Sequence, residues 1–207
     1  MRKRAPKRAA HERRRLILES AETVFAASNY ARVGTAGLAK AAGVSEPALY
    51  RYFSSKKDLY ISTLKATGMR LLGIWQRIAA EVVNPLDIVW TIGLGYYDHL
   101  RSRSPVTKLL FQALSEADDP EVRATLRDDF ASLVGFLEET LEKGKAQALI
   151  RRDVDSRVAA WHFMAIGLAF DLIGVLQMEG EIDRAKVEDW GRLYLKSIAE
   201  EAPGRSR

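Results

Sequence analysis

A short run of hydroxyl, acidic and basic side chains after residue 53 has the chemistry to bind a polyanion. Ser55 can cap a helix, and Asp58, three residues on, completes an acidic variant of the capping box. The unpaired N–H groups at such a helix start, with Lys56 and Lys57 beside them, can hold a phosphate. The alternative is an ordinary solvated first turn. Basic residues are disfavoured near a helix N-terminus, so the pair favours an anionic partner.

Two short helices joined by a tight turn must position these side chains. The first ends at Gly43, a residue suited to the left-handed conformation that stops a helix. Ser45 then caps a second helix, with Glu46 and Pro47 in its first turn, where an acid suits the helix dipole and a missing N–H costs nothing. Residues 34–53 therefore predict a helix-turn-helix, whose second helix enters a DNA major groove.

The residue types on this motif match both base and phosphate contacts. Glu46 can accept a hydrogen bond from a cytosine amine, and Pro47 can touch a thymine methyl group. The hydroxyl groups of Thr35 and Ser45 can bind phosphate oxygens. Arg51 is evenly balanced between a DNA contact and a charge that simply faces solvent. These residues form the predicted DNA-binding set.

Residues 11–65 resemble the DNA-binding domain of the TetR family of transcriptional regulators. The resemblance rests on a first helix, RRLILESAETVFAASNY, followed by LAKAAGVSEPALYRYFSSKKDLY. It implies that Tyr50, Tyr52 and Lys56 hold the DNA backbone. The chain departs from the family at Gly34, where Thr or Ser is common, and also lacks polar residues that members often carry at positions 36, 37 and 48.

Charge along the 207 residues is uneven. The formal net charge is +5, yet residues 1–15 hold eight Lys or Arg against one Glu. We read residues 1–10 as a disordered basic arm that binds DNA phosphates, although a solubilising tail has the same composition. No cysteine is present, so disulfides and thiolate chemistry are excluded, and the N-terminus lacks the apolar core of a secretory signal. A cytoplasmic protein fits these features.

Apolar side chains recur at helical spacing along the rest of the chain, without strand-like alternation. The helix that begins near Lys56 continues towards Asn84, farther than a small DNA-binding domain needs. We therefore predict an all-α protein of about nine helices. Its N-terminal three-helix helix-turn-helix domain covers 11–65, and a C-terminal helical ligand-binding and dimerisation domain covers 66–202.

The helix before the last is unusually apolar. Residues 158–178 approach membrane-spanning length, but Asp171 within them is costly in lipid, so a helix buried in a bundle is favoured over a membrane span. In the TetR family the final two helices pair with their copies to make a homodimer. The alternative is that they close the monomer core. The predicted interface residues are Ala160, Gly167, Gly174, Trp190 and Tyr194.

Catalytic patterns are absent from the sequence. No P-loop, G-x-S-x-G or H-E-x-x-H occurs, no metal-ligand cluster is evident, and no cofactor is implied. His99 follows Asp98, but helix neighbours point in different directions, so we read this pair as surface chemistry. The chain is not predicted to be an enzyme.

A cavity for a small apolar or aromatic effector is implied by the family resemblance. Most large apolar residues in the second domain are expected to be core. The predicted pocket residues are Trp75, Ile78, Trp90, Tyr97, Phe111, Phe130, Trp161 and Asp171. The sequence thus predicts a homodimeric regulator, most simply a repressor released from an inverted-repeat operator by its ligand. The alternative is a helical small-molecule-binding or catalytic protein with a relic helix-turn-helix.

Overall fold

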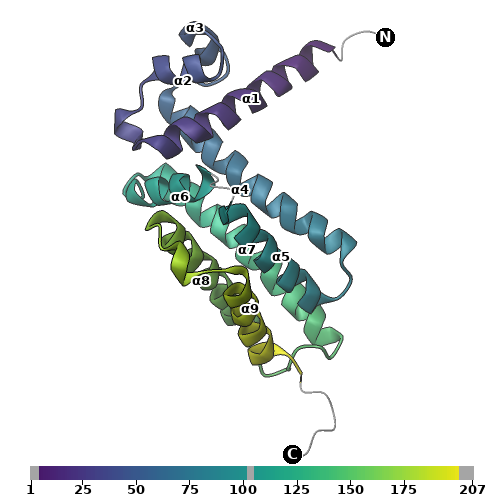
Figure 1. Ribbon diagram of the computed structural model, residues 1–207. Coiled ribbons are helices and arrows are strands. Elements are labelled where there is room, and N and C mark those ends of the chain that lie inside the picture. Colours follow the sequence, from purple (N-terminus) through teal and green to yellow (C-terminus); the bar gives the residue numbers. More distant parts are fainter. Residues whose placement is uncertain (1–4, 102–104, 201–207) are drawn as a thin grey trace, which may run out of the picture. The chain divides into compact units, whose positions relative to one another are not determined.

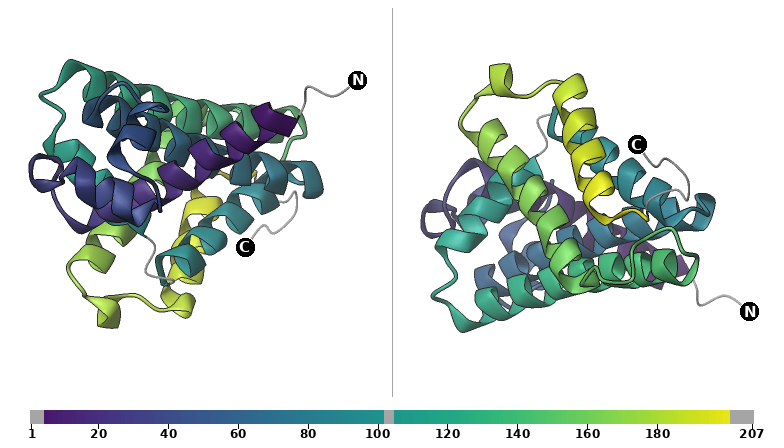
Figure 2. Two further views of the ribbon diagram at one scale, coloured as in Figure 1. Left: turned by 90° about the horizontal axis from the view of Figure 1, so that it is seen from above. Right: turned by 90° about the horizontal axis from the view of Figure 1, so that it is seen from below.

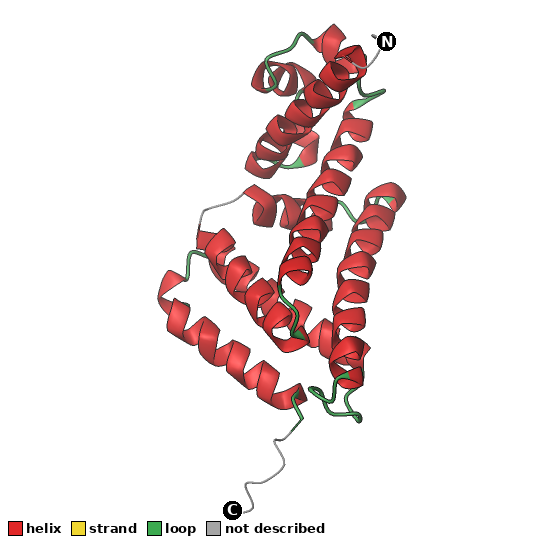
Figure 3. Ribbon diagram, turned by 90° about the vertical axis from the view of Figure 1, so that its right-hand side faces the viewer, coloured by secondary structure: helices red, strands yellow, loops and turns green. Residues whose placement is uncertain are grey.

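The computed structural model of the protein describes residues 5–101 and 105–200 (Figure 3). Within these ranges the regular elements are all helical, and one isolated antiparallel bridge joins Ile150 to Ala199. The predicted all-α fold is confirmed. The described α-helices are α1 (Ala5–Ala27), α2 (Thr35–Ala41), α3 (Glu46–Tyr50), α4 (Lys56–Glu81), α5 (Pro85–Arg101), α6 (Pro105–Ser115), α7 (Pro120–Ala146), α8 (Ser156–Val175) and α9 (Arg184–Ile198), with short 3-10 turns η1 (Tyr30–Arg32) and η2 (Glu179–Glu181).

The chain forms two compact units rather than two consecutive domains. The first unit combines Met1–Arg70 with Pro105–Asp129, and the second combines Leu71–Ser104 with Phe130–Arg207. The boundary predicted after residue 65 therefore misses α6 and the start of α7. These segments join the first unit because α6 packs along α1. Such a long-range contact leaves no local trace in the sequence.

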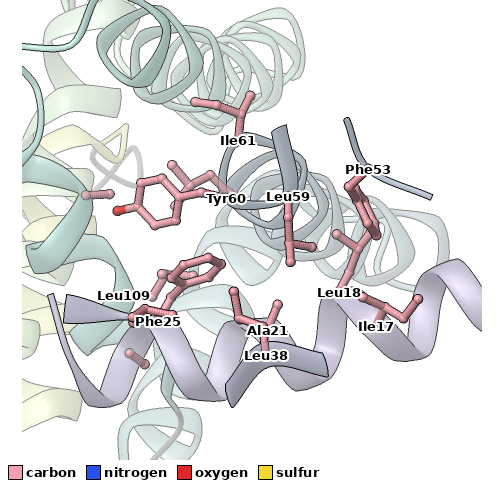
Figure 4. Packing of buried hydrophobic residues seen from close by; sticks show 14 of the residues in the cluster. Ile17, Leu18, Ala21, Phe25, Leu38, Phe53, Leu59, Tyr60, Ile61 and Leu109 are labelled. Carbon is pink, nitrogen blue, oxygen red and sulfur yellow. The ribbon is translucent and has the colours of Figure 1, made fainter. Parts of the chain in front are cut away.

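The core of the first unit lies between α1, α2, α4 and α6. Phe25 of α1, Tyr60 of α4 and Leu109 of α6 converge in it (Figure 4). The rings of Phe25 and Tyr60 meet edge to face, with centroids 4.8 Å apart. Burial raises the pKa of the Tyr60 hydroxyl. Because α2 also contributes the buried Leu38, the same core fixes the first helix of the motif.

The first helix starts earlier than the sequence analysis predicts. Residues 5–10, predicted as part of a disordered arm, form the first turns of α1, while residues 1–4 lie outside the described part of the chain. The segment can be helical because Ala, Lys and Arg are strong helix formers and Pro6 is tolerated in a first turn.

The core of the second unit is built from α5, α7, α8 and α9. Among its fully buried residues are Val89, Val134, Leu141 and Ile150. Helix α5 packs against both α8 and α9 (Figure 1, Figure 2). The bridge at Ile150 ties the loop before α8 to the end of α9.

Helix α8 is less buried than its composition predicts. Among the described residues it is the one helix that is long and apolar enough to cross a membrane. Only 22% of its most apolar 18-residue stretch is buried. Within the single chain the helix is therefore only partly covered. A row of exposed apolar side chains runs along it: Val158, Trp161, Leu172, Val175 and Leu176. Buried in the same helix, Asp171 accepts a hydrogen bond from the Tyr96 hydroxyl at 2.6 Å.

Candidate nucleic-acid interface

The turn of the motif has the geometry that its sequence predicts. Gly43 adopts φ +63°, the left-handed conformation that ends α2. Ser45 then caps α3, its Oγ accepting a hydrogen bond from the backbone N–H of Ala48 at 3.3 Å. Gly34 precedes α2 as a cap without a side-chain hydrogen bond. The buried Leu49 anchors α3 to the core, leaving the other side of this short helix exposed.

The start of α4 carries a reciprocal capping box. Ser55 Oγ accepts from the backbone N–H of Asp58 at 3.0 Å, and the Asp58 carboxylate accepts from the backbone N–H of Ser54 at 2.8 Å. The latter bond lowers the pKa of Asp58. One of the N–H groups at the helix start, that of Asp58, is thus used inside the protein, and the negative charge of the Asp58 carboxylate stands beside the others.

Lys56 points into the first unit. Its ammonium group donates to the backbone carbonyls of Tyr30 and Val33, both at 3.0 Å, and lies 4.3 Å from the centre of the Tyr30 ring. These contacts hold the connection between α1 and α2 against the start of α4. The structure therefore assigns Lys56 a positioning role in place of the exposed position expected of a phosphate ligand.

Lys57 is also paired within the first unit. Its ammonium group lies 2.8 Å from a carboxylate oxygen of Asp119 and 2.8 Å from one of Glu121. The hydrogen bonds to these acids raise the pKa of Lys57. Both lysines from which the sequence analysis predicts an anionic partner therefore have partners inside the chain.

The remaining predicted DNA contacts cluster around α3. Pro47, Tyr50 and Arg51 are exposed, with Tyr50 at 46% exposure, and Ser45 is exposed beside them. The other members, Thr35, Glu46 and Tyr52, are half-buried. A surface that joins a ring, a guanidinium group, a carboxylate and hydroxyl groups can contact both phosphates and base edges.

Two positioning residues of the first unit were missed by the sequence analysis. Arg14 donates to Ser62 Oγ at 3.1 Å and lies 4.8 Å from the centre of the Phe53 ring. Glu22, which is buried, accepts from Thr67 Oγ1 at 2.6 Å and from Arg70 at 2.5 Å. Both join α1 to segments far along the chain. The sequence does contain a sign of the role of Glu22, because this acid interrupts an apolar helical face.

The predicted effector residues do not gather at one site. Phe111 lies in the first unit, whereas the others belong to the second. Trp75 and Ile78 pack in the core of the second unit, and Tyr97 joins a small cluster with Phe170. Phe130 stacks on the exposed Trp161, with centroids 6.3 Å apart. Trp90 alone of this predicted set lines a described groove, formed by α5, α8 and α9.

The predicted dimer residues divide into buried and exposed groups. Ala160 and Tyr194 are buried in the core of the second unit, where the Tyr194 hydroxyl donates to the carbonyl of Ala159 at 2.9 Å. A side chain at Gly167 would face the Tyr96 ring. Only Gly174 and Trp190 are exposed. Small size and apolar character alone cannot tell which side of a helix faces its own core.

A capped helix-turn-helix with an exposed second helix, carried by an all-α chain, defines a helix-turn-helix DNA-binding protein. Residues 17–63 match the sequence profile described as "Bacterial regulatory proteins, tetR family". This match agrees with the resemblance that the motif predicts, and it covers the helix-turn-helix part of the chain.

Individual relatives match parts of the chain. The nucleoid occlusion factor SlmA of Marinomonas sp. (strain MWYL1) is 35% identical over 89 residues, which are 42% of this chain and 45% of that protein. The HTH-type transcriptional activator FasR of Mycolicibacterium smegmatis is 30% identical over 56% of this chain and 52% of its own length. The chain thus spans about half the length of these two relatives.

A solved structure extends the likeness to nearly the whole fold. The transcriptional regulator FadR from Bacillus subtilis, in complex with stearoyl-CoA, superimposes with a TM-score of 0.76. It covers 88% of this chain and 98% of its own, at 18% sequence identity. At that identity the likeness describes the fold of both units.

Proposed function

We propose that this protein is a sequence-specific DNA-binding transcriptional regulator, acting as a homodimer and released from its operator by a small effector. The observation that carries the proposal is the exposed surface of α3, with Pro47, Tyr50 and Arg51 facing outward from a helix that Ser45 caps. As a regulator it works without catalysis, and in the cytoplasm, where it meets chromosomal DNA.

An unpaired apolar surface supports the homodimer. Val158, Trp161, Leu172 and Val175 lie at spacings of three, eleven and three along α8, and Leu193 of α9 is 65% exposed. Such spacing places side chains on one face of a helix, the arrangement found where helices pair. Two copies joined in this way can offer two recognition helices to successive major grooves, roughly 34 Å apart, on an inverted repeat.

Effector control has two supports. A protein of the same fold, the FadR mentioned above, was solved with stearoyl-CoA, and the second unit of this chain contains an apolar groove. Helix α4 contributes residues to both units without a break. An effector that favours a non-binding arrangement of the dimer will release DNA, because a ligand with equal affinity for both states shifts nothing.

A mobility-shift experiment with the DNA upstream of the protein's own gene tests the proposal. The unaltered chain should retard this fragment at low salt and a shuffled fragment much less. Arg51→Ala should weaken binding and lower the slope against salt by about one unit if the guanidinium contacts phosphate. Arg152→Ala, an exposed arginine in the second unit, is the matched control and should leave the slope unchanged.

Failure to retard any promoter fragment at low salt would contradict the proposal. It would favour the alternative, a helical small-molecule-binding or catalytic protein with a relic motif. A regulator that activates would retard DNA equally, so transcription from the bound promoter must be measured with and without the protein. More transcript in its absence identifies a repressor.

A further inference from the structure

A groove in the second unit lies where α5, α8 and α9 meet. It is a shallow groove that is partly open to solvent. Residues of α5 such as Val89, residues of α8 such as Ile166 and residues of α9 such as Leu195 line it. None of its lining residues carries a charge. The groove is therefore a surface for dispersion and burial, with no cation or carboxylate to hold a charged group.

Gly191 allows a large ring to form one wall of the groove. A Cβ atom added at Gly191 would lie 2.6 Å from the Trp90 ring, and one added at Gly93 would lie 3.6 Å from the Phe163 ring. Real Cβ atoms do not approach as closely as 2.6 Å, so only glycine at position 191 lets Trp90 rest on the backbone of α9. The rings of α5 and α8 thereby cover helix backbone that a ligand would otherwise meet.

One polar group of the groove is already paired within the protein. The hydroxyl of Tyr194, a lining residue, donates to the Ala159 carbonyl at 2.9 Å. Burial raises the pKa of Tyr194, so this hydroxyl stays neutral near pH 7. Trp190 lies almost parallel to Phe170, with ring centroids 4.9 Å apart and 4° between the planes. These two rings cover one face of each other and add apolar surface to the lining.

We propose that this groove binds an uncharged, flat or elongated apolar molecule and is the effector site of the protein. A charged group placed here would lose its hydration without gaining a partner, so it would bind weakly or stay in the solvent. The site differs from the predicted pocket because α9 forms one wall. The role of the groove as an effector site rests on the proposed function, whereas binding of the molecule itself requires no DNA.

Helix α9 gives the site a route to the DNA-binding arrangement. Trp190 lines the groove and is also 37% exposed, and Leu193 on the same helix is 65% exposed. A ligand that moves Trp190 therefore moves the helix that carries part of the proposed dimer surface. Occupancy of the groove should alter how two copies pair, and through that the spacing of their recognition helices.

Two dyes with one ring system test both the site and the ligand class on the full chain. N-phenyl-1-naphthylamine is uncharged, and 8-anilinonaphthalene-1-sulfonate adds an anion to the same rings. The neutral dye should bind with energy transfer from tryptophan. The sulfonate should bind at least about tenfold more weakly, because the lining offers its charge no partner.

Matched variants on α5 locate the binding. Gly93→Leu directs a side chain into the groove and should weaken binding of the neutral dye by about tenfold or more. Gly95→Leu adds the same side chain where nothing lies within 4 Å and should leave binding unchanged. Gly93→Ala, whose methyl group meets Phe163 at an ordinary distance, is a milder variant if Gly93→Leu does not fold. Thermal unfolding reports whether each variant folds.

Three results would overturn the inference: equal binding of both dyes, equal effects of the folded position-93 and position-95 variants, or no binding of the neutral dye. Mobility shifts keep this test separate from that of the proposed function. If the protein retards DNA but binds no neutral dye, the proposed ligand site is wrong and the proposed regulator function stands. If the protein binds the dye but never DNA, the proposed ligand site stands and the proposed regulator function is wrong.

Discussion

Lys56 shows how one residue can fit two roles until its contacts are known. Its position after a helix cap matches a phosphate ligand of the family, yet its ammonium group donates to two backbone carbonyls at 3.0 Å. Those carbonyls belong to the connection between α1 and α2. Removing the ammonium group leaves them without a donor, which is costly in a partly buried place.

Replacing Lys56 by Ala should therefore lower the free energy of unfolding by about 1–3 kcal/mol. Urea denaturation measures this change, and Lys40→Ala, at an exposed lysine of α2, should have little effect. The slope of DNA affinity against salt separates the roles, since a phosphate ligand would lower it by about one unit. Unchanged stability, together with a lower slope of DNA affinity against salt, would show that Lys56 contacts DNA phosphate.

Asp129 is a second residue whose setting decides its chemistry. Its carboxyl group packs against α4 at Gly68, where an added Cβ would lie 2.4 Å from its Cγ. Desolvation, with the nearby charge of Asp128, raises its pKa to about 6, and Lys65 opposes this shift. The folded protein therefore favours the protonated acid more than the unfolded chain does.

The sign of the pH effect follows from that shift. Asp129 contributes stability below the ordinary pKa of an aspartic acid, and this contribution is lost as pH rises through about 6. Asp129→Asn should raise the free energy of unfolding at pH 7.5, on the order of 1 kcal/mol after solvent screening, and change it little at pH 4. Urea denaturation at both pH values tests this. An equal effect of the substitution at both would show that Asp129 does not titrate differently on folding.

At the scale of elements, the motif was predictable because its signals are local. A glycine that ends α2, a serine that caps α3 and an acid in the first turn of α4 act within a few residues. The partners of Lys56 and Lys57, the packing of α6 on α1 and the exposed face of α8 depend on distant segments. No spacing rule within one helix contains them, so the sequence could not show that α6 joins the first unit or that both lysines have partners inside the chain.

The two glycines around α2 make the role of the turn testable. Gly43 has φ +63°, which a side chain disfavours, whereas Gly37 lies inside the helix. Gly43→Ala should cost about 1 kcal/mol in unfolding free energy, and Gly37→Ala should gain about 0.5–1 kcal/mol from helix propensity. Thermal unfolding compares them. A stabilising Gly43→Ala would mean that the turn relaxes to another conformation.

For the whole molecule, the apolar face of α8 is the main feature that one chain leaves unexplained. Exposed single apolar residues are common, but a row along one helix marks a surface that is covered in use. The occupant we propose is a second copy, because two half-sites that share the contacts would also let one short recognition helix bind DNA tightly.

Leu172→Asp should therefore convert the dimer to a monomer and weaken operator binding together. The charge would stand on the apolar face, where Leu172 is 48% exposed in the single chain, so the monomer itself should still fold. Val83→Asp is the matched control, because Val83 is 90% exposed in the connection between α4 and α5, away from α8. Sedimentation at micromolar concentration measures assembly, and a mobility shift measures operator affinity. A dimeric Leu172→Asp protein with unaltered affinity would exclude this face as the interface, and an unaltered chain that sediments as a monomer would exclude the homodimer.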